Sequence, residues 1–206
     1  MIIESWEGPA PDGEVHDDPY IPVEVDFPLD QEHVHKFSCY YRSTQGGVHM
    51  PEEGWGPPES MLEVVVDVYS GRLCRLVLVG VLEARYKEFD PGQVVNGDPV
   101  FDIDATLGDR VSARDRVNIG GEMTPSVDQY EQYELWVGGD QFTILFEGRA
   151  TSVAIRAGAH LIVFVDEDRE VSGFQITGVT PSQRAKIIDT ITYTGKVIEG
   201  EDTFSG

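Results

Sequence analysis

His33 and His35 are the residues whose type and spacing most directly suggest chemistry. They stand two positions apart in HVHKFSCYYR, residues 33 to 42, a run rich in aromatic residues that predicts a β-strand. Residues two apart in a strand point to the same face, roughly 7 Å apart, so both imidazoles can reach one divalent metal ion. The sequence supplies no third ligand nearby. The alternative is a pair of histidines on a solvated or half-buried strand.

This H-x-H pair resembles the metal motif of the cupins, which are β-barrel proteins. The resemblance covers His33 and His35 alone and implies a metal-dependent enzyme or small-ligand binder built on a β-barrel. The chain departs from the cupin pattern after the pair, where Cys39 and Tyr40 stand in place of a glutamate. A second cupin motif is not recognisable. No cofactor is expected, apart from a divalent metal at this histidine pair.

Other catalytic motifs are missing from the sequence. There is no G-x-S-x-G elbow, no Walker loop and no G-x-G-x-x-G turn after a strand. Cys39 and Cys74 stand inside apolar runs, which predicts buried free thiols rather than catalytic nucleophiles. Asp102 and Asp104 have the spacing of calcium ligands, but Leu107 occupies the position where a calcium loop needs glycine.

The charge of the chain is its largest compositional signal. Against 37 acidic residues there are 15 basic ones, which gives a net charge of −22. Ten of the acidic residues fall in the first 35 positions, where there is no lysine or arginine. Nucleic acids and anionic membranes are therefore expected to be repelled. Two explanations of the acidity remain: a surface for a basic protein partner, or solvation, as in proteins adapted to strong salt.

A long Gly/Pro-rich loop, residues 43 to 60, carries the exposed aromatic candidate Trp55. A tryptophan in such a loop can anchor a partner as a binding hot spot, or it can fold back over one end of the core. The predicted partner contacts combine this residue with acidic neighbours in the same loop and in the N-terminal segment: Trp55, Glu52, Glu53, Asp17 and Asp18.

Three β-hairpins dominate the predicted fold. Apolar, β-branched runs flank short turns at residues 62–82, 133–146 and 160–179. Thr180-Pro181-Ser182-Gln183 has the pattern of a helix start with a capping box, which predicts a helix over about 181–189 followed by a last strand over 190–199. We therefore expect a mainly β protein: an antiparallel β-sandwich or open barrel with three hairpins and one short C-terminal helix.

The chain length suits one large domain. We expect an extended, acidic Pro/Gly-rich arm at 1–22, a single mostly β domain at 23–200 and a polar tail at 201–206. The hairpins at 62–81 and 161–179 look alike, which leaves open a weak duplication into halves 23–90 and 128–200, although unrelated hairpins also share this pattern.

The favoured function is a non-enzymatic acidic binding protein, an inhibitor or immunity-type protein that docks on a basic protein partner. The alternatives are a structural or assembly protein of a salt-adapted organism, and a β-barrel metal-dependent enzyme or small-ligand binder. The first residues lack the basic and apolar regions of a signal peptide, and no apolar stretch approaches the roughly 20 residues that cross a bilayer. A cytoplasmic location is therefore expected.

Overall fold

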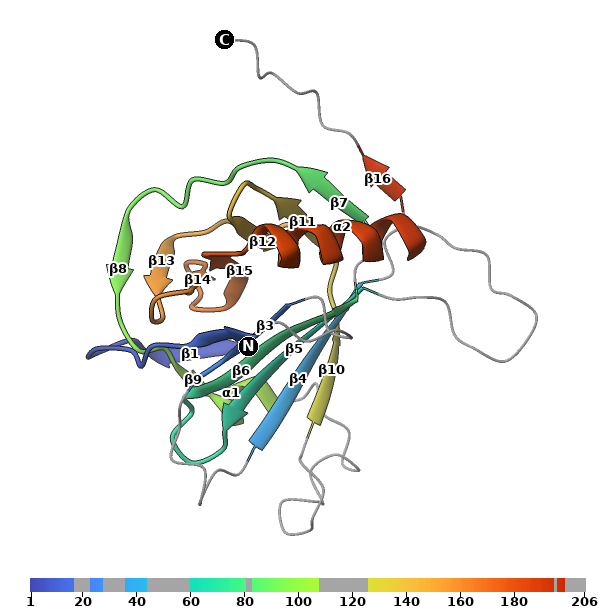
Figure 1. Ribbon diagram of the computed structural model, residues 1–206. Helices are drawn as coiled ribbons and strands as arrows, with labels where there is room; N and C mark the ends of the chain where they lie inside the picture. The colour runs from blue at the N-terminus through green and yellow to red at the C-terminus, as the bar shows by residue number, and fades with distance from the viewer. Residues whose placement is uncertain are drawn as a thin grey trace, which may run out of the picture.

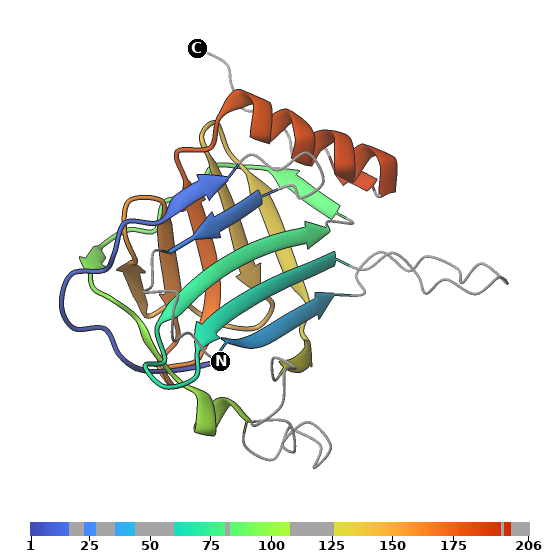
Figure 2. The ribbon, with the colours of Figure 1, turned by 60° about the horizontal axis from the view of Figure 1, so that its bottom comes forward.

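The computed structural model describes residues 1–16, 23–27, 36–43, 60–80, 83–107, 126–194 and 196–198. Within these residues the chain forms two large sheets packed face to face, with the six-stranded sheet in front of the eight-stranded one in Figure 2. The fold is mainly β and sandwich-like, not a closed barrel, which confirms the predicted class. Among the described residues no helix is long and apolar enough to cross a membrane.

The six-stranded sheet is built around the first predicted hairpin. In spatial order its strands are β10 (Ser126–Tyr130), β4 (Lys36–Ser43), β5 (Ser60–Asp67), β6 (Leu73–Gly80), β3 (Val23–Asp26) and β2 (Glu14–His16). The hairpin β5–β6 lies in the middle of the sheet, as the density of valine and leucine in its two strands predicts.

The eight-stranded sheet contains the other two predicted hairpins, β11–β12 and β14–β15. In spatial order its strands are β16 (Lys196–Ile198), β7 (Glu83–Tyr86), β11 (Tyr133–Val137), β12 (Gln141–Phe146), β15 (Val171–Thr177), β14 (Leu161–Val165), β13 (Val153–Arg156) and β8 (Val94–Asn96). The two hairpins that look alike in sequence therefore belong to different sheets.

The core fills the space between the sheets. One continuous cluster of buried side chains draws on both, including Phe37, Leu62 and Leu76 from the first sheet and Ile144 and Phe174 from the second. Tyr41 of β4 stacks on Phe146 of β12 with ring centroids 4.5 Å apart, a direct contact across the sandwich. Burial of this apolar surface is the main favourable contribution to folding.

The pairing is mixed rather than purely antiparallel. The hairpins are antiparallel, but four pairs among the described strands are parallel: β10 with β4, β11 with β7, β13 with β8 and β16 with β7. Parallel neighbours need long connections, and these pairs join segments distant in the chain. The pattern of neighbouring residues in the sequence therefore does not predict which of these distant strands pair.

The N-terminal segment contains strands where an irregular arm was expected. β1 (Ile2–Ser5) pairs with β9 (Val100–Asp102), and β2 joins the six-stranded sheet; residues 17–22 lie outside the described part. Met1 and Ile3 are buried, and the α-amino group of Met1 donates a hydrogen bond to Tyr41 Oη at 2.8 Å. The apolar residues that precede the first proline thus complete the core. The free energy gained by burying them outweighs the tendency of the later proline and glycine residues to disrupt regular structure.

The C-terminal helix is longer than predicted. Its start is confirmed: the Thr180 backbone N–H donates to Gln183 Oε1 at 2.9 Å, the capping box. α2 then runs over Pro181–Thr194, so the strand expected from residue 190 begins only at Lys196, as β16. Residues 190–194 include no glycine or proline, and β-branched residues weaken a helix by less than about 1 kcal/mol each. Figure 1 shows α2 at one end of the sandwich and α1 (Ile103–Leu107) toward the other.

Arg149, which follows β12, connects the segment after β10 with the β14–β15 turn. Its guanidinium contacts Glu131 at 2.8 Å, Asp166 at 3.6 Å, and Glu170, which accepts a hydrogen bond from Nη1. Burial disfavours the positive charge, but the surrounding carboxylates outweigh it and raise the pKa of Arg149. The Arg149 side chain is 17% exposed, so water screens these contacts little.

Replacing Arg149 should therefore destabilise the fold. We expect Arg149→Met to lower the free energy of unfolding by about 2 to 4 kcal/mol, because three carboxylates would lose their common cation. Arg85→Met is the matched control: Arg85 contacts Glu134 at 2.9 Å but is 46% exposed, and its loss should cost less than about 1 kcal/mol. Urea unfolding measures both, and equal losses would show that the Arg149 cluster has no special role.

Candidate functional site

The residues predicted from sequence to bind a metal or a partner lie outside the described part of the structure. These are His33 and His35 for the metal, and Trp55, Asp17, Asp18, Glu52 and Glu53 for the partner. Within the described ranges no group of three or more His, Cys, Asp or Glu side chains could hold a metal ion. The metal and partner predictions for these seven residues therefore stay predictions.

Both cysteines are free and buried, as predicted. Cys39 lies on β4 and Cys74 on β6, with β5 between them. Burial raises the pKa of the Cys39 thiol to about 12, so the thiolate needed for nucleophilic attack is scarce at neutral pH. This position suits a packing role rather than catalysis.

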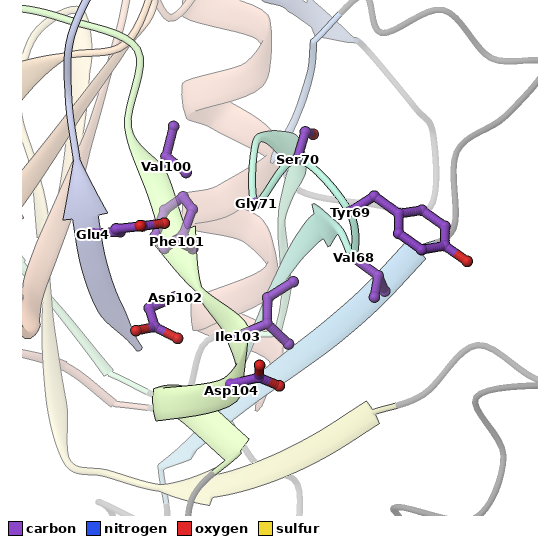
Figure 3. A pocket seen from close by; sticks show the side chains of 10 residues that line it. All are labelled: Glu4, Val68, Tyr69, Ser70, Gly71, Val100, Phe101, Asp102, Ile103 and Asp104. Carbon is purple, nitrogen blue, oxygen red and sulfur yellow. The ribbon is translucent and has the colours of Figure 1, made fainter.

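A pocket of about 210 Å³ opens where β1, β9 and the β5–β6 turn meet. Glu4 comes from β1, Asp102 from β9 and Asp104 from α1, so residues about 100 positions apart share one site (Figure 3). Apolar side chains of the same segments complete the lining: Val68, Val100, Phe101 and Ile103. The pocket thus combines carboxylates with apolar walls.

The β5–β6 turn is fixed against β9 by close backbone contact. The Phe101 N–H donates to Gly71 O at 2.8 Å, and Arg72 bridges to Val100. Gly71 has a φ of +66°, and a Cβ at this position would lie 2.4 Å from Phe101 O. Glycine therefore meets two demands here, a left-handed backbone and a contact too close for any side chain.

Side-chain hydrogen bonds shape the rest of the turn. Asp67 Oδ2 accepts from the Ser70 backbone N–H at 2.9 Å and from Ser70 Oγ at 2.6 Å. On the other wall, Asp102 Oδ1 accepts from the Ala105 N–H at 2.8 Å and so caps the first turn of α1. Asp67 and Asp102 therefore have structural roles, whereas Glu4 and Asp104 are exposed to solvent.

Tyr69 stands at the tip of the turn with 78% of its surface exposed. In Figure 3 its ring points away from the strands, and Glu4 and Asp102 lie on the opposite side of Ile103 from it. A large exposed aromatic at the rim of a pocket offers contact area to a partner.

More acidic residues adjoin the pocket through the β14–β15 turn. The Ile3 N–H donates to Arg169 O at 2.9 Å, and Arg169 Nη1 donates to Glu4 O at 3.0 Å. This turn therefore holds β1 by hydrogen bonds and leaves Glu167 and Asp168 exposed. We call the set Glu4, Asp102, Asp104, Glu167 and Asp168 the acidic end of the molecule.

The pocket lining combines acidic and apolar side chains. It includes carboxylates, one serine and one tyrosine, but no histidine, cysteine or lysine among its described residues. The Ser70 hydroxyl donates to the Asp67 carboxylate, which also accepts the Ser70 backbone N–H, so this pair holds the turn together. Negative charge beside apolar walls suits a positively charged group with an aliphatic stem.

No protein-family model matches the chain, and no curated protein matches its sequence.

Sequence reasoning missed the acidic end as a site, although it noted several of its members. Asp102 and Asp104 have the spacing of calcium ligands, and Glu4 is one of the acidic residues of the N-terminal segment. Tyr69 is the last residue of the first strand of a predicted hairpin. A large aromatic residue beside the turn is the one sequence feature that could have indicated a binding site there. Their proximity depends on the pairing of β1 with β9.

The contact at Gly71 gives a test of the pocket wall. Gly71→Ala should lower the free energy of unfolding by about 3 kcal/mol or more, because it adds a backbone clash to an unfavourable φ. Gly148→Ala is the control: Gly148 has a φ of +74° but open space around it, so only about 1 to 2 kcal/mol should be lost. Thermal or urea unfolding separates the two, and equal losses would contradict the close contact.

The buried thiol gives a second test. In a Cys74→Ser background, Cys39 should react with a disulfide reagent at pH 8 at least about 100-fold more slowly in the native protein than in denaturant. Because its folded pKa of about 12 lies above the ordinary value of 9.0, this group's contribution to stability falls as pH rises from 9 toward 12. Rapid native labelling would show that Cys39 is accessible.

Proposed function

We propose that this chain is a non-enzymatic binding protein of the inhibitor or immunity type, and that its acidic end docks on a basic protein partner. The observation that carries the proposal is the pocket in which Glu4, Asp102 and Asp104 surround apolar walls beside the exposed Tyr69. The net charge of −22 supports it, since the field of the whole molecule attracts a basic surface over distances of about a Debye length.

The pocket suits arginine or lysine side chains of such a partner. An aliphatic stem can pack on Val100 and Ile103 while its cationic head meets the exposed carboxylates of Glu4 and Asp104. Tyr69 adds a separate aromatic surface on the other side of Ile103, and tyrosine is frequent among residues that dominate binding energy. Electrostatic complementarity of this kind raises association rates and orients the partner.

Solvation remains the competing explanation of the charge, and it predicts something different. If the acidity is an adaptation to salt in a structural or assembly protein, the loss of any exposed acidic residue should weaken the binding of a cationic ligand by about the same amount. A docking surface predicts that the acidic end matters more than other acidic positions. The comparison of two matched pairs of substitutions separates the two explanations.

The test compares two variants that each lose two charges. One is Glu4→Gln with Asp104→Asn at the acidic end, and the other is Asp140→Asn with Glu147→Gln, exposed positions outside it. Binding of a short oligo-arginine peptide is measured by calorimetry at low and at physiological salt. We expect the acidic-end variant to bind at least about tenfold more weakly than the wild type and the control variant to stay within about twofold.

Two further measurements make the outcome decisive. Tyr69→Ala should weaken peptide binding, and thermal unfolding of the same variant measures any accompanying change in stability. Equal losses in the two charge variants would show that the peptide responds to diffuse charge, and the acidic end would then be rejected as the docking surface. A strong rise of thermal stability with molar KCl in the wild type would favour the salt-adapted alternative.

A further inference from the structure

We draw no further inference here: the strongest candidate, the acidic pocket between β1, β9 and the β5–β6 turn, belongs to the site already described, and among the described residues its carboxylates have no second feature that identifies a ligand.

Discussion

The seating of β1 at the end of the sandwich is the contact on which the site depends. Ile3 is completely buried, and Met1 both contributes its side chain to the core and accepts a hydrogen bond from the Val171 N–H at 2.8 Å. On one side β1 pairs with β9, and on the other it bonds to the β14–β15 turn. Two apolar side chains and a few backbone hydrogen bonds thus hold together three segments that are far apart in the sequence.

The acidic side chains near β1 fall into two groups. Inside the partly buried cluster, Arg149 compensates Glu131, Asp166 and Glu170, so those carboxylates have a structural partner. At the surface nearby, Glu4 and Asp104 face solvent, where ionised carboxylates are well hydrated. One end of the molecule therefore contains both acids that pair with Arg149 and acids that face solvent, and the net charge alone does not distinguish them.

The hairpins could be predicted because their information is local. In β5 and β6, β11 and β12, and β14 and β15, apolar runs flank a short turn, and the turn fixes which strands pair. The capping residues Thr180 and Gln183 likewise identified the start of α2. Its end was placed too early, because Ile191 and Tyr193 suit a strand and a helix almost equally, although the sequence has a glycine, Gly195, directly after the last helical residue.

The candidate site could not be predicted because the information that forms it is not local in the sequence. Glu4 and Asp102 come together through the pairing of β1 with β9, and pairing at such sequence separation depends on the packed core rather than on neighbouring residues. The parallel pairs, such as β10 with β4, escaped prediction in the same way.

The assembly of the pocket from three distant segments makes it a property of the native state alone. An unfolded chain, or one in which β1 has detached, does not present Glu4, Tyr69 and Asp104 together. Any molecule that binds there selects the fully folded protein, and by mass action it raises the apparent stability by about 2.7 kcal/mol at a concentration 100 times its dissociation constant. Occupancy of the pocket and closure of the end of the sandwich by β1 are therefore thermodynamically linked, so a bound partner would also protect the N-terminal strand from local unfolding.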